Sequence, residues 1–191
     1  MIATLVRHGE TDWSRSGRHT GRTDVPLTDG GRRQAEQAGA ELAGRRFWRV
    51  LTSPLTRATE TCRLAGMGDG EPCDDLLEWD YGDYEGRTTD DIRAERPGWL
   101  LWRDGCPGGE RPDDVGRRAD RVITTLRDAT GDVILFAHGH ILRVLAARWV
   151  GLAPAEGSRL ALDPATISVL GYERETSVIR LWNEEPSRSA R

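Results

Sequence analysis

The sequence predicts a single-domain α/β fold with a mostly parallel central sheet flanked by helices. Its 191 residues fit one domain with a substantial core. Short apolar runs rich in β-branched residues, typical of buried strands, alternate with segments of helical periodicity. Strands that alternate with helices favour a parallel sheet, because a helix carries the chain back to the edge where the next strand begins.

The N-terminal segment predicts a strand and then a helix. Met1–Arg7 is an apolar run of strand length, and the polar, glycine-rich segment Glu10–Pro26 follows it as a loop. Thr28 and Asp29 form a helix start signal ahead of an apolar face at helical spacing, and Gly44 ends that helix.

The middle of the chain repeats this order. Phe47–Leu51 predicts a second strand, and Leu55–Leu64 predicts the helix after it. Asp74–Gly86 is acidic and aromatic and is expected to be a loop. Thr88 opens a short helix that Pro97 breaks.

The last third predicts a helix, a strand and a helix, followed by a hairpin. Apolar residues at helical spacing indicate a helix over Pro112–Asp128, and Asp132–Ala137 and Ile141–Val150 follow as strand and helix. Thr166–Tyr172 and Ser177–Trp182 alternate enough to form a terminal hairpin. We therefore expect one domain over residues 1–183 and a polar C-terminal tail over 184–191.

Composition limits the partners and the compartment. The formal net charge of −4 argues against a nucleic-acid-binding protein, which would usually be basic. No apolar stretch approaches the ~18 residues that cross a bilayer, and we find no secretory signal. The chain has an odd number of cysteines, and none of them forms a CxxC pair. This usage indicates a reducing compartment for Cys62, Cys73 and Cys106. We expect a cytoplasmic protein without a nucleic-acid or membrane partner, and the hairpin edge is where a homodimer would form.

Two predicted strands end in a histidine followed by glycine. Arg7-His8-Gly9 follows the first strand, and His138-Gly139-His140 follows the strand at 132–137. In open α/β sheets these strand ends face the ligand crevice. A neutral histidine can attack a phosphoryl group, and arginine binds phosphate oxygens with two parallel bonds. Arg57 lies just after the second strand and so belongs to the same sheet edge. The pattern predicts phosphate chemistry on histidine.

A metal site is the weaker reading of the second histidine motif. His138 and His140 could form a ligand pair, but no cysteine lies nearby and no local carboxylate completes the set. We expect no metal and no cofactor.

Seven motifs in the chain resemble the signature of the histidine phosphatase (phosphoglycerate mutase-like) superfamily and cover nearly the whole sequence in order. They are Arg7-His8-Gly9-Glu10-Thr11, His19-Thr20-Gly21, Pro26-Leu27-Thr28-Asp29-Gly30-Gly31, Ser53-Pro54-Leu55-Thr56-Arg57-Ala58, Glu78-Trp79-Asp80-Tyr81-Gly82-Asp83-Tyr84-Glu85-Gly86, Pro107-Gly108-Gly109-Glu110 and His138-Gly139-His140. Within the superfamily, the chain is most similar to a subgroup that includes acid phosphatases and sedoheptulose bisphosphatase. The resemblance implies a phosphoglycerate mutase-like fold.

The resemblance also implies the site residues. His8 would be the nucleophile that becomes phosphohistidine, with Arg7, Arg57 and His138 around the phosphate. Glu78 would protonate the leaving oxygen, a role that requires a raised pKa, and the neighbours Asp75, Trp79 and Asp80 are compatible with one. The residues alone do not separate Glu78 from Glu85. The substrate side would be formed by Ser14, Thr20, Gly21, Tyr81, Gly139 and His140. For His140, as for His19, the residues alone leave pocket wall and surface equally open.

The chain departs from the family pattern in three places. Ser14 stands where many members carry Asn, and Arg111 stands where members often carry Ser, which would add a cation for substrate. The segment Gly86–Glu110 is shorter than the insertion of the mutases. Its candidates for holding a second anion are Arg87, Arg93, Arg96 and Arg103.

We therefore predict a metal-independent phosphatase that hydrolyses phosphomonoesters of small metabolites through a phosphohistidine. A cofactor-dependent phosphoglycerate mutase is the alternative enzyme. A non-catalytic module that binds phosphorylated ligands is the alternative from another class.

Overall fold

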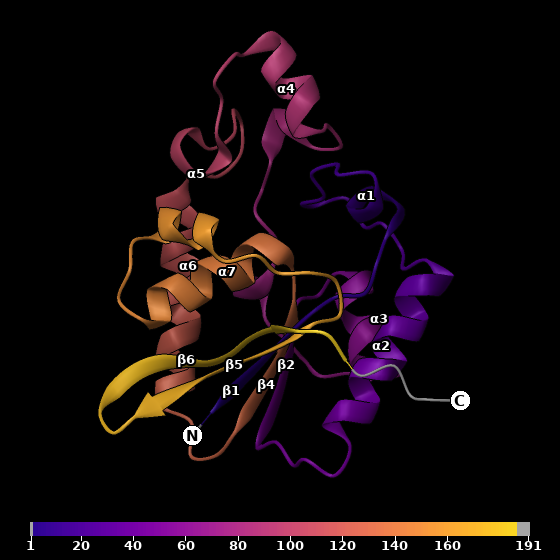
Figure 1. Cartoon of the computed structure of the whole chain (residues 1–191), viewed down its shortest axis with the longest axis vertical. Coiled ribbons are helices and arrows are strands. Elements are labelled where there is room, and N and C mark those ends of the chain that lie inside the picture. The colour runs from indigo at the N-terminus through magenta and orange to yellow at the C-terminus, as the bar shows by residue number, and fades with distance from the viewer. Residues whose placement is uncertain (1, 187–191) are drawn as a thin grey trace.

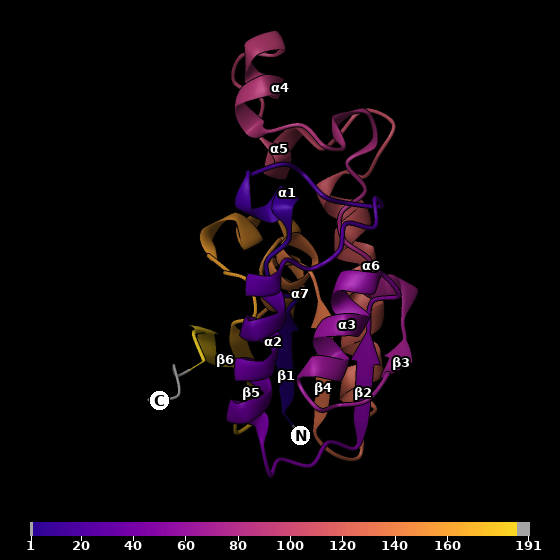
Figure 2. The same cartoon turned by 90° about the vertical axis from the view of Figure 1, so that its right-hand side faces the viewer.

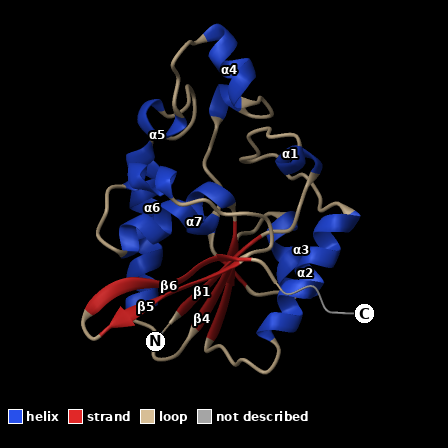
Figure 3. Cartoon of the chain, viewed as in Figure 1, coloured by secondary structure: helices blue, strands red, loops and turns tan. Residues whose placement is uncertain are grey.

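The computed structural model describes residues 2–186 and contains a central sheet with helices on both faces (Figures 1 and 3). The strands are β1 (Ala3–Arg7), β2 (Arg49–Thr52), β3 (Glu71–Pro72), β4 (Val133–Ala137), β5 (Ile167–Glu173) and β6 (Thr176–Glu184). They form one six-stranded sheet in the order β3-β2-β4-β1-β5-β6. The first four in that order are mutually parallel, whereas β5 is antiparallel to β1 and β6 to β5. The predicted α/β fold is confirmed.

The helices cover the two faces of the sheet in pairs, α2 with α3 and α6 with α7 (Figures 1 and 2). The helices are α1 (Asp12–Arg15), α2 (Asp29–Leu42), α3 (Thr56–Leu64), α4 (Thr89–Glu95), α5 (Leu101–Asp104), α6 (Pro112–Arg127) and α7 (Gly139–Trp149). Alternating strand residues separate the two cores. Val6 and Ile134 pack with the α2 and α3 side, and Leu5 and Leu135 pack with the α6 and α7 side. The buried parallel strands therefore read as continuous apolar runs.

The predicted elements exist, with shifted ends. α7 begins at Gly139, two residues before its expected start, with His138 as its N-cap residue. The acidic loop contains two short 3-10 turns, Asp74–Leu76 and Gly82–Tyr84. β6 includes Glu184, which pairs with Ile167, so the first residue of the predicted tail belongs to the sheet. Residues 187–191 of that tail lie outside the described residues.

The register of the parallel strands brings three loops to one sheet edge. Arg7 lies beside Ala137, and Thr52 lies beside Phe136. The backbone N–H of His8 donates to the Ala137 carbonyl at 2.9 Å, and that of Ser53 donates to the Phe136 carbonyl at 2.9 Å. This edge is the ligand-binding end of an open α/β sheet. The segment that carries α4 and α5 stands beyond it, at the top of Figures 1 and 2.

Gly31, in the first turn of α2, holds the loop after β1 in place by close backbone contact. A Cβ at Gly31 would lie 2.2 Å from the Glu10 carbonyl oxygen, whereas one at Gly30 would meet its nearest atom at 3.4 Å. We expect Gly31→Ala to lower the free energy of unfolding by about 1–3 kcal/mol through overpacking. Gly30→Ala, the matched control, is expected to leave it equal or raise it by about 0.5 kcal/mol. Urea denaturation followed by tryptophan fluorescence measures both, and equal stabilities would contradict the prediction.

Candidate active site

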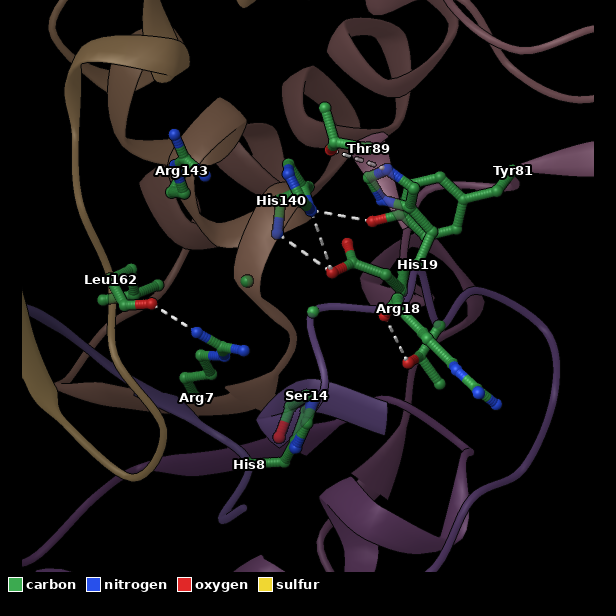
Figure 4. Close-up of a pocket in the computed structure, with 14 residues that line it drawn as sticks. Arg7, His8, Ser14, Arg18, His19, Tyr81, Thr89, His140, Arg143 and Leu162 are labelled. Atoms are coloured by element: carbon green, nitrogen blue, oxygen red, sulfur yellow. Dashed lines mark hydrogen bonds and ion pairs between the residues drawn. The ribbon is translucent and has the colours of Figure 1, made fainter. Parts of the chain in front are cut away.

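A pocket of about 260 Å³ opens at the sheet edge where β1 and β4 end (Figure 4). Its walls combine the end of β1, the loop after α1, the acidic loop, the start of α7 and the segment before β5. The lining residues are Arg7, His8, Ser14, Gly17, Arg18, His19, Thr20, Glu78, Tyr81, Thr89, Gly139, His140, Arg143 and Leu162.

His8 is buried at the end of β1 and presents one free ring nitrogen. Its Nδ1 lies 2.7 Å from the Gly9 carbonyl oxygen. A carbonyl only accepts, so Nδ1 carries the proton and Nε2 keeps its lone pair. Burial, together with the charges of Arg57 and Arg7, lowers the pKa of His8 well below its ordinary value. His8 is therefore a neutral imidazole in the tautomer that a nucleophile requires.

Arg7 offers an unsatisfied donor beside His8. Its Nη1 donates to the Leu162 carbonyl, and its buried Nε has no partner within residues 2–186. A Cβ at Gly139 would lie 3.4 Å from the Arg7 guanidinium, so the start of α7 lies close against this side chain. Because a buried N–H without a partner is costly, a phosphate oxygen would stabilise this arrangement.

His138 and Arg57 lie behind the pocket wall. The Arg57 Nε donates to His138 Nδ1 at 3.1 Å, and His138 Nε2 lies 2.7 Å from Ser53 Oγ. Since Nδ1 accepts, Nε2 carries the proton and donates to Ser53. The His138 ring packs edge-on against the His8 ring, with centroids 5.1 Å apart. Both side chains thus have protein partners in the structure, and neither is among the described residues that line the pocket.

Arg57 also donates hydrogen bonds to the loop after α1, which forms the opposite wall of the pocket. Its Nη atoms donate to the carbonyls of Thr20, Gly21 and Thr23. Gly21 does not line the pocket. Its N–H donates to Glu85 at 2.8 Å, and an added Cβ would lie 2.6 Å from the Trp79 carbonyl oxygen. The sequence alone did not decide between Glu78 and Glu85 as the proton donor. In the structure, Glu85 accepts hydrogen bonds from the loop instead.

Among the described residues, Glu78 is the single carboxylate in the pocket wall, and it is held by backbone donors. Its carboxylate accepts from the N–H groups of Trp79 at 2.9 Å, His140 at 3.0 Å and Ile141 at 2.9 Å. Burial alone would raise the pKa of Glu78, but hydrogen bonds from His140 outweigh it and hold that pKa well below its ordinary value. The His140 and Ile141 donors belong to the N-terminus of α7, which favours a negative charge.

The expectation of a raised pKa for Glu78 is therefore wrong. It assumed that the neighbouring carboxylates act on Glu78. Asp75 instead pairs with Arg121, and Asp80 accepts from Gly82 and lies 3.6 Å from Arg22.

Tyr81 and His140 form a polar wall next to Glu78. The Tyr81 hydroxyl lies 2.7 Å from His140 Nδ1. Burial and the charge of Glu78 raise the pKa of Tyr81 well above its ordinary value, so the phenol in this contact stays protonated. The His19 ring stacks at 4.7 Å from the Tyr81 ring. The sequence left open whether His19 and His140 lie in the pocket wall or on the surface, and both line the pocket.

The sequence analysis missed two arginines of the pocket wall and wrongly expected a third arginine to face the substrate. Arg143 on α7 and Arg18 line the pocket. Arg111, expected to face substrate, is the exposed N-cap residue of α6 and lies outside the wall. Ser14 lines the pocket, although its hydroxyl is used within the N-terminal cap of α1. The signal for Arg143 was its position a little over one helical turn beyond His138.

In residues 2–186 there is no group of three or more His, Cys, Asp or Glu side chains arranged to hold a metal ion. None of the helices in that range has the length and apolar character to cross a membrane.

Comparison with known proteins gives one consistent family. The model of the histidine phosphatase superfamily (branch 1) matches residues 3–185. An acid phosphatase of Mycobacterium tuberculosis is 46% identical over 184 residues, 93% of this chain and 91% of the relative. Sedoheptulose 1,7-bisphosphatase of Saccharomyces cerevisiae is 38% identical and covers 78% of this chain and 67% of its own. A solved open-reading-frame product of Mycobacterium tuberculosis superposes with a TM-score of 0.93 at 43% identity, covering 97% of this chain and 98% of its own.

Proposed function

The chain belongs to the histidine phosphatase superfamily, and we propose that it hydrolyses phosphomonoesters of small metabolites by way of a phosphohistidine at His8. The acid phosphatase and the bisphosphatase among its relatives support this reaction class. One observation carries the proposal. A neutral His8 with a free Nε2, an Arg7 donor without a partner and the Glu78 carboxylate meet in one pocket.

The first step transfers the phosphoryl group to the protein. The His8 Nε2 lone pair attacks phosphorus and the ester P–O bond breaks. Glu78, which has taken the proton of the monoanionic ester, gives that proton to the departing alkoxide oxygen. The guanidinium of Arg7 neutralises charge on the phosphoryl oxygens, which is the main catalytic demand of phosphoryl transfer.

The second step returns the protein to its starting state. Glu78, now a carboxylate, takes a proton from water as the water oxygen attacks phosphorus. The P–N bond breaks, phosphate leaves, and His8 is neutral again. The Nδ1–H bond to the Gly9 carbonyl is kept throughout and stabilises the positive charge that His8 carries while phosphorylated.

Arg57 and His138 act in this mechanism as positioning residues. Their mutual hydrogen bond and the contact of the His138 ring with His8 fix the orientation of the nucleophile. The bonds from Arg57 to three loop carbonyls fix the opposite wall. Such support matters because a displacement of about 1 Å at a reacting group costs large factors in rate.

The test is phosphate release without a metal. We expect the protein to release phosphate from p-nitrophenyl phosphate and from sugar phosphates, and EDTA to leave the rate unchanged. Complete loss of activity in EDTA would overturn the metal-independent mechanism. Activity that requires 2,3-bisphosphoglycerate and releases negligible phosphate would identify the mutase instead. Tight phosphate binding without turnover of any ester would identify the binding module.

The cytoplasmic location and the homodimer are further parts of this proposal. Cys62, Cys73 and Cys106 are all free thiols, which supports a reducing compartment. β6 is the outermost strand of the sheet, so its free edge is available to a second copy.

A further inference from the structure

Arg143 is a rigidly held cation without a counter-ion. Its Nε donates to the Gly157 carbonyl and its Nη2 to the Ser158 carbonyl, both at 3.1 Å, and its guanidinium lies 4.6 Å from the centre of a Trp102 ring. Within residues 2–186 no carboxylate forms an ion pair with it. Burial lowers the pKa of Arg143, which is the direction expected for a cation short of a partner.

The turn that holds Arg143 is shaped for close packing. Gly157 lies in the 3-10 segment Pro154–Arg159. A Cβ there would lie 2.9 Å from the Trp102 ring and 3.0 Å from the Arg143 backbone. The glycine therefore lets the two acceptor carbonyls reach the guanidinium while Trp102 covers it.

The pocket carries cations at both of its ends, not at the His8 end alone. Three guanidinium groups line it, those of Arg7, Arg18 and Arg143, against one carboxylate, Glu78. His8, His19 and His140 all have lowered pKa values and are neutral near pH 7. Figure 4 shows Arg143 at the opposite end of the pocket from His8. A phosphate at His8 would use Arg7 and leave the distal cation unpaired.

Two arginines of the α4–α5 segment form ion pairs away from the pocket. Arg87 pairs with Glu95 at 2.7 Å, and Arg103 pairs with Asp104 at 2.8 Å. Neither lines the pocket. Arg93 and Arg96, the other two candidates from the sequence, are not among its described lining residues either.

We propose that Arg143 is the cation of a second oxyanion subsite, so that the preferred substrates are phosphomonoesters carrying another anionic group, either a carboxylate or a second phosphate. This inference rests on the proposed function for the first subsite, where the reacting phosphate lies at His8. The subsite is preorganised, because the carbonyls and the indole already fix the guanidinium, and little side-chain entropy is lost on binding.

The test compares substrates that differ only in the second anion. The pairs are 3-phosphoglycerate with glycerol 3-phosphate, and fructose 1,6-bisphosphate with fructose 6-phosphate. We expect the protein to favour the more anionic member of at least one pair by about tenfold or more in kcat/KM, as for a charge-assisted hydrogen bond. The pair that shows the preference tells carboxylate from phosphate.

Variants assign the preference to Arg143. Arg143→Met is expected to reduce it to within about twofold, and Arg143→Lys, which keeps the charge without the fork of donors, to keep part of it. Arg103→Met, the matched control from the α4–α5 segment, is expected to keep all of it. The urea midpoint of each variant monitors folding. No preference in the unaltered protein, or full preference in Arg143→Met, would overturn the proposal.

A binding experiment tests the anion subsite independently of the proposed hydrolysis. Calorimetry of the four compounds on His8→Ala measures the preference without turnover. If the unaltered protein released no phosphate from any ester, the proposed function would fail. A tenfold binding preference that Arg143→Met abolishes in the same His8→Ala background would still support the anion subsite, and equal binding would overturn it.

Discussion

His8→Ala is expected to lower kcat for p-nitrophenyl phosphate by about 10³-fold or more. The substitution removes the atom that forms the P–N bond, and residual catalysis would come from Arg7 and binding alone. Steady-state release of p-nitrophenolate measures the loss. The cavity left by the ring lies next to the phosphate position, so added imidazole is expected to restore part of the rate.

Two controls make this result specific to the nucleophile. Rapid acid quench with labelled substrate is expected to trap a phosphoenzyme in the unaltered protein and none in His8→Ala. The urea midpoint reports whether the fold survives, because His8 also packs against His138. Retention of more than about a tenth of the activity by a folded His8→Ala protein would exclude the phosphohistidine mechanism.

The location of His8 was predictable because it depends on local pattern alone. A buried apolar run that ends at Arg7-His8 places both side chains at the carboxyl end of a strand, and parallel neighbours end at the same edge. The same reasoning placed His138 after β4. The two rings do meet in the structure, with centroids 5.1 Å apart.

The role of each side chain within the site depends on contacts that local pattern does not contain. The Glu78 carboxylate meets N–H groups at the start of α7, more than sixty residues later in the chain. Its ionisation is set by that long-range contact, whereas Asp75 and Asp80, its neighbours in sequence, pair with other groups. Arg57 was placed at the correct sheet edge, but its donors are taken by loop carbonyls whose path the sequence does not specify.

Arg143 was missed for the same reason. A surface cation is the ordinary interpretation of an arginine on a helix, and the spacing of Arg143 from His138 does not by itself place it in the pocket. Its position depends on two long-range contacts. The turn Pro154–Arg159 packs against α7, and Trp102, from a different segment, packs against the guanidinium.

Glu78→Gln is expected to lower kcat for alkyl phosphates by about 10²–10⁴-fold, the usual contribution of a general acid. The glutamine keeps the shape of the side chain but has no acidic proton for the alkoxide. p-Nitrophenyl phosphate is the internal control, because p-nitrophenolate leaves without a proton, and its first step is expected to be much less affected. Burst kinetics separate that step from hydrolysis of the phosphoenzyme. Equal losses of the first step for both esters would contradict the acid role.

The pH dependence of Glu78→Gln gives the sharper test, and its sign follows from proton counting. Glu78 is ionised at neutral pH in the free protein, because its pKa is held well below the ordinary value. Protonated Glu78 with a dianionic ester has the same number of protons as ionised Glu78 with a monoanionic ester, so both routes give one pH profile. Above the second pKa of the ester, about 6, kcat/KM for an alkyl phosphate should fall about tenfold per pH unit.

Below pH about 6, kcat/KM for the alkyl phosphate should not change with pH until Glu78 itself is protonated. His8 adds no limb near pH 6.5, because its own pKa is lowered well below that value. In Glu78→Gln the required proton is gone from the mechanism, so the fall above pH 6 is expected to disappear along with most of the rate. If the fall persisted unchanged in the variant, the proton would reach the leaving oxygen from another group, and the hydroxyl of Tyr81, bonded to His140 beside the same carboxylate, would be the next donor to replace.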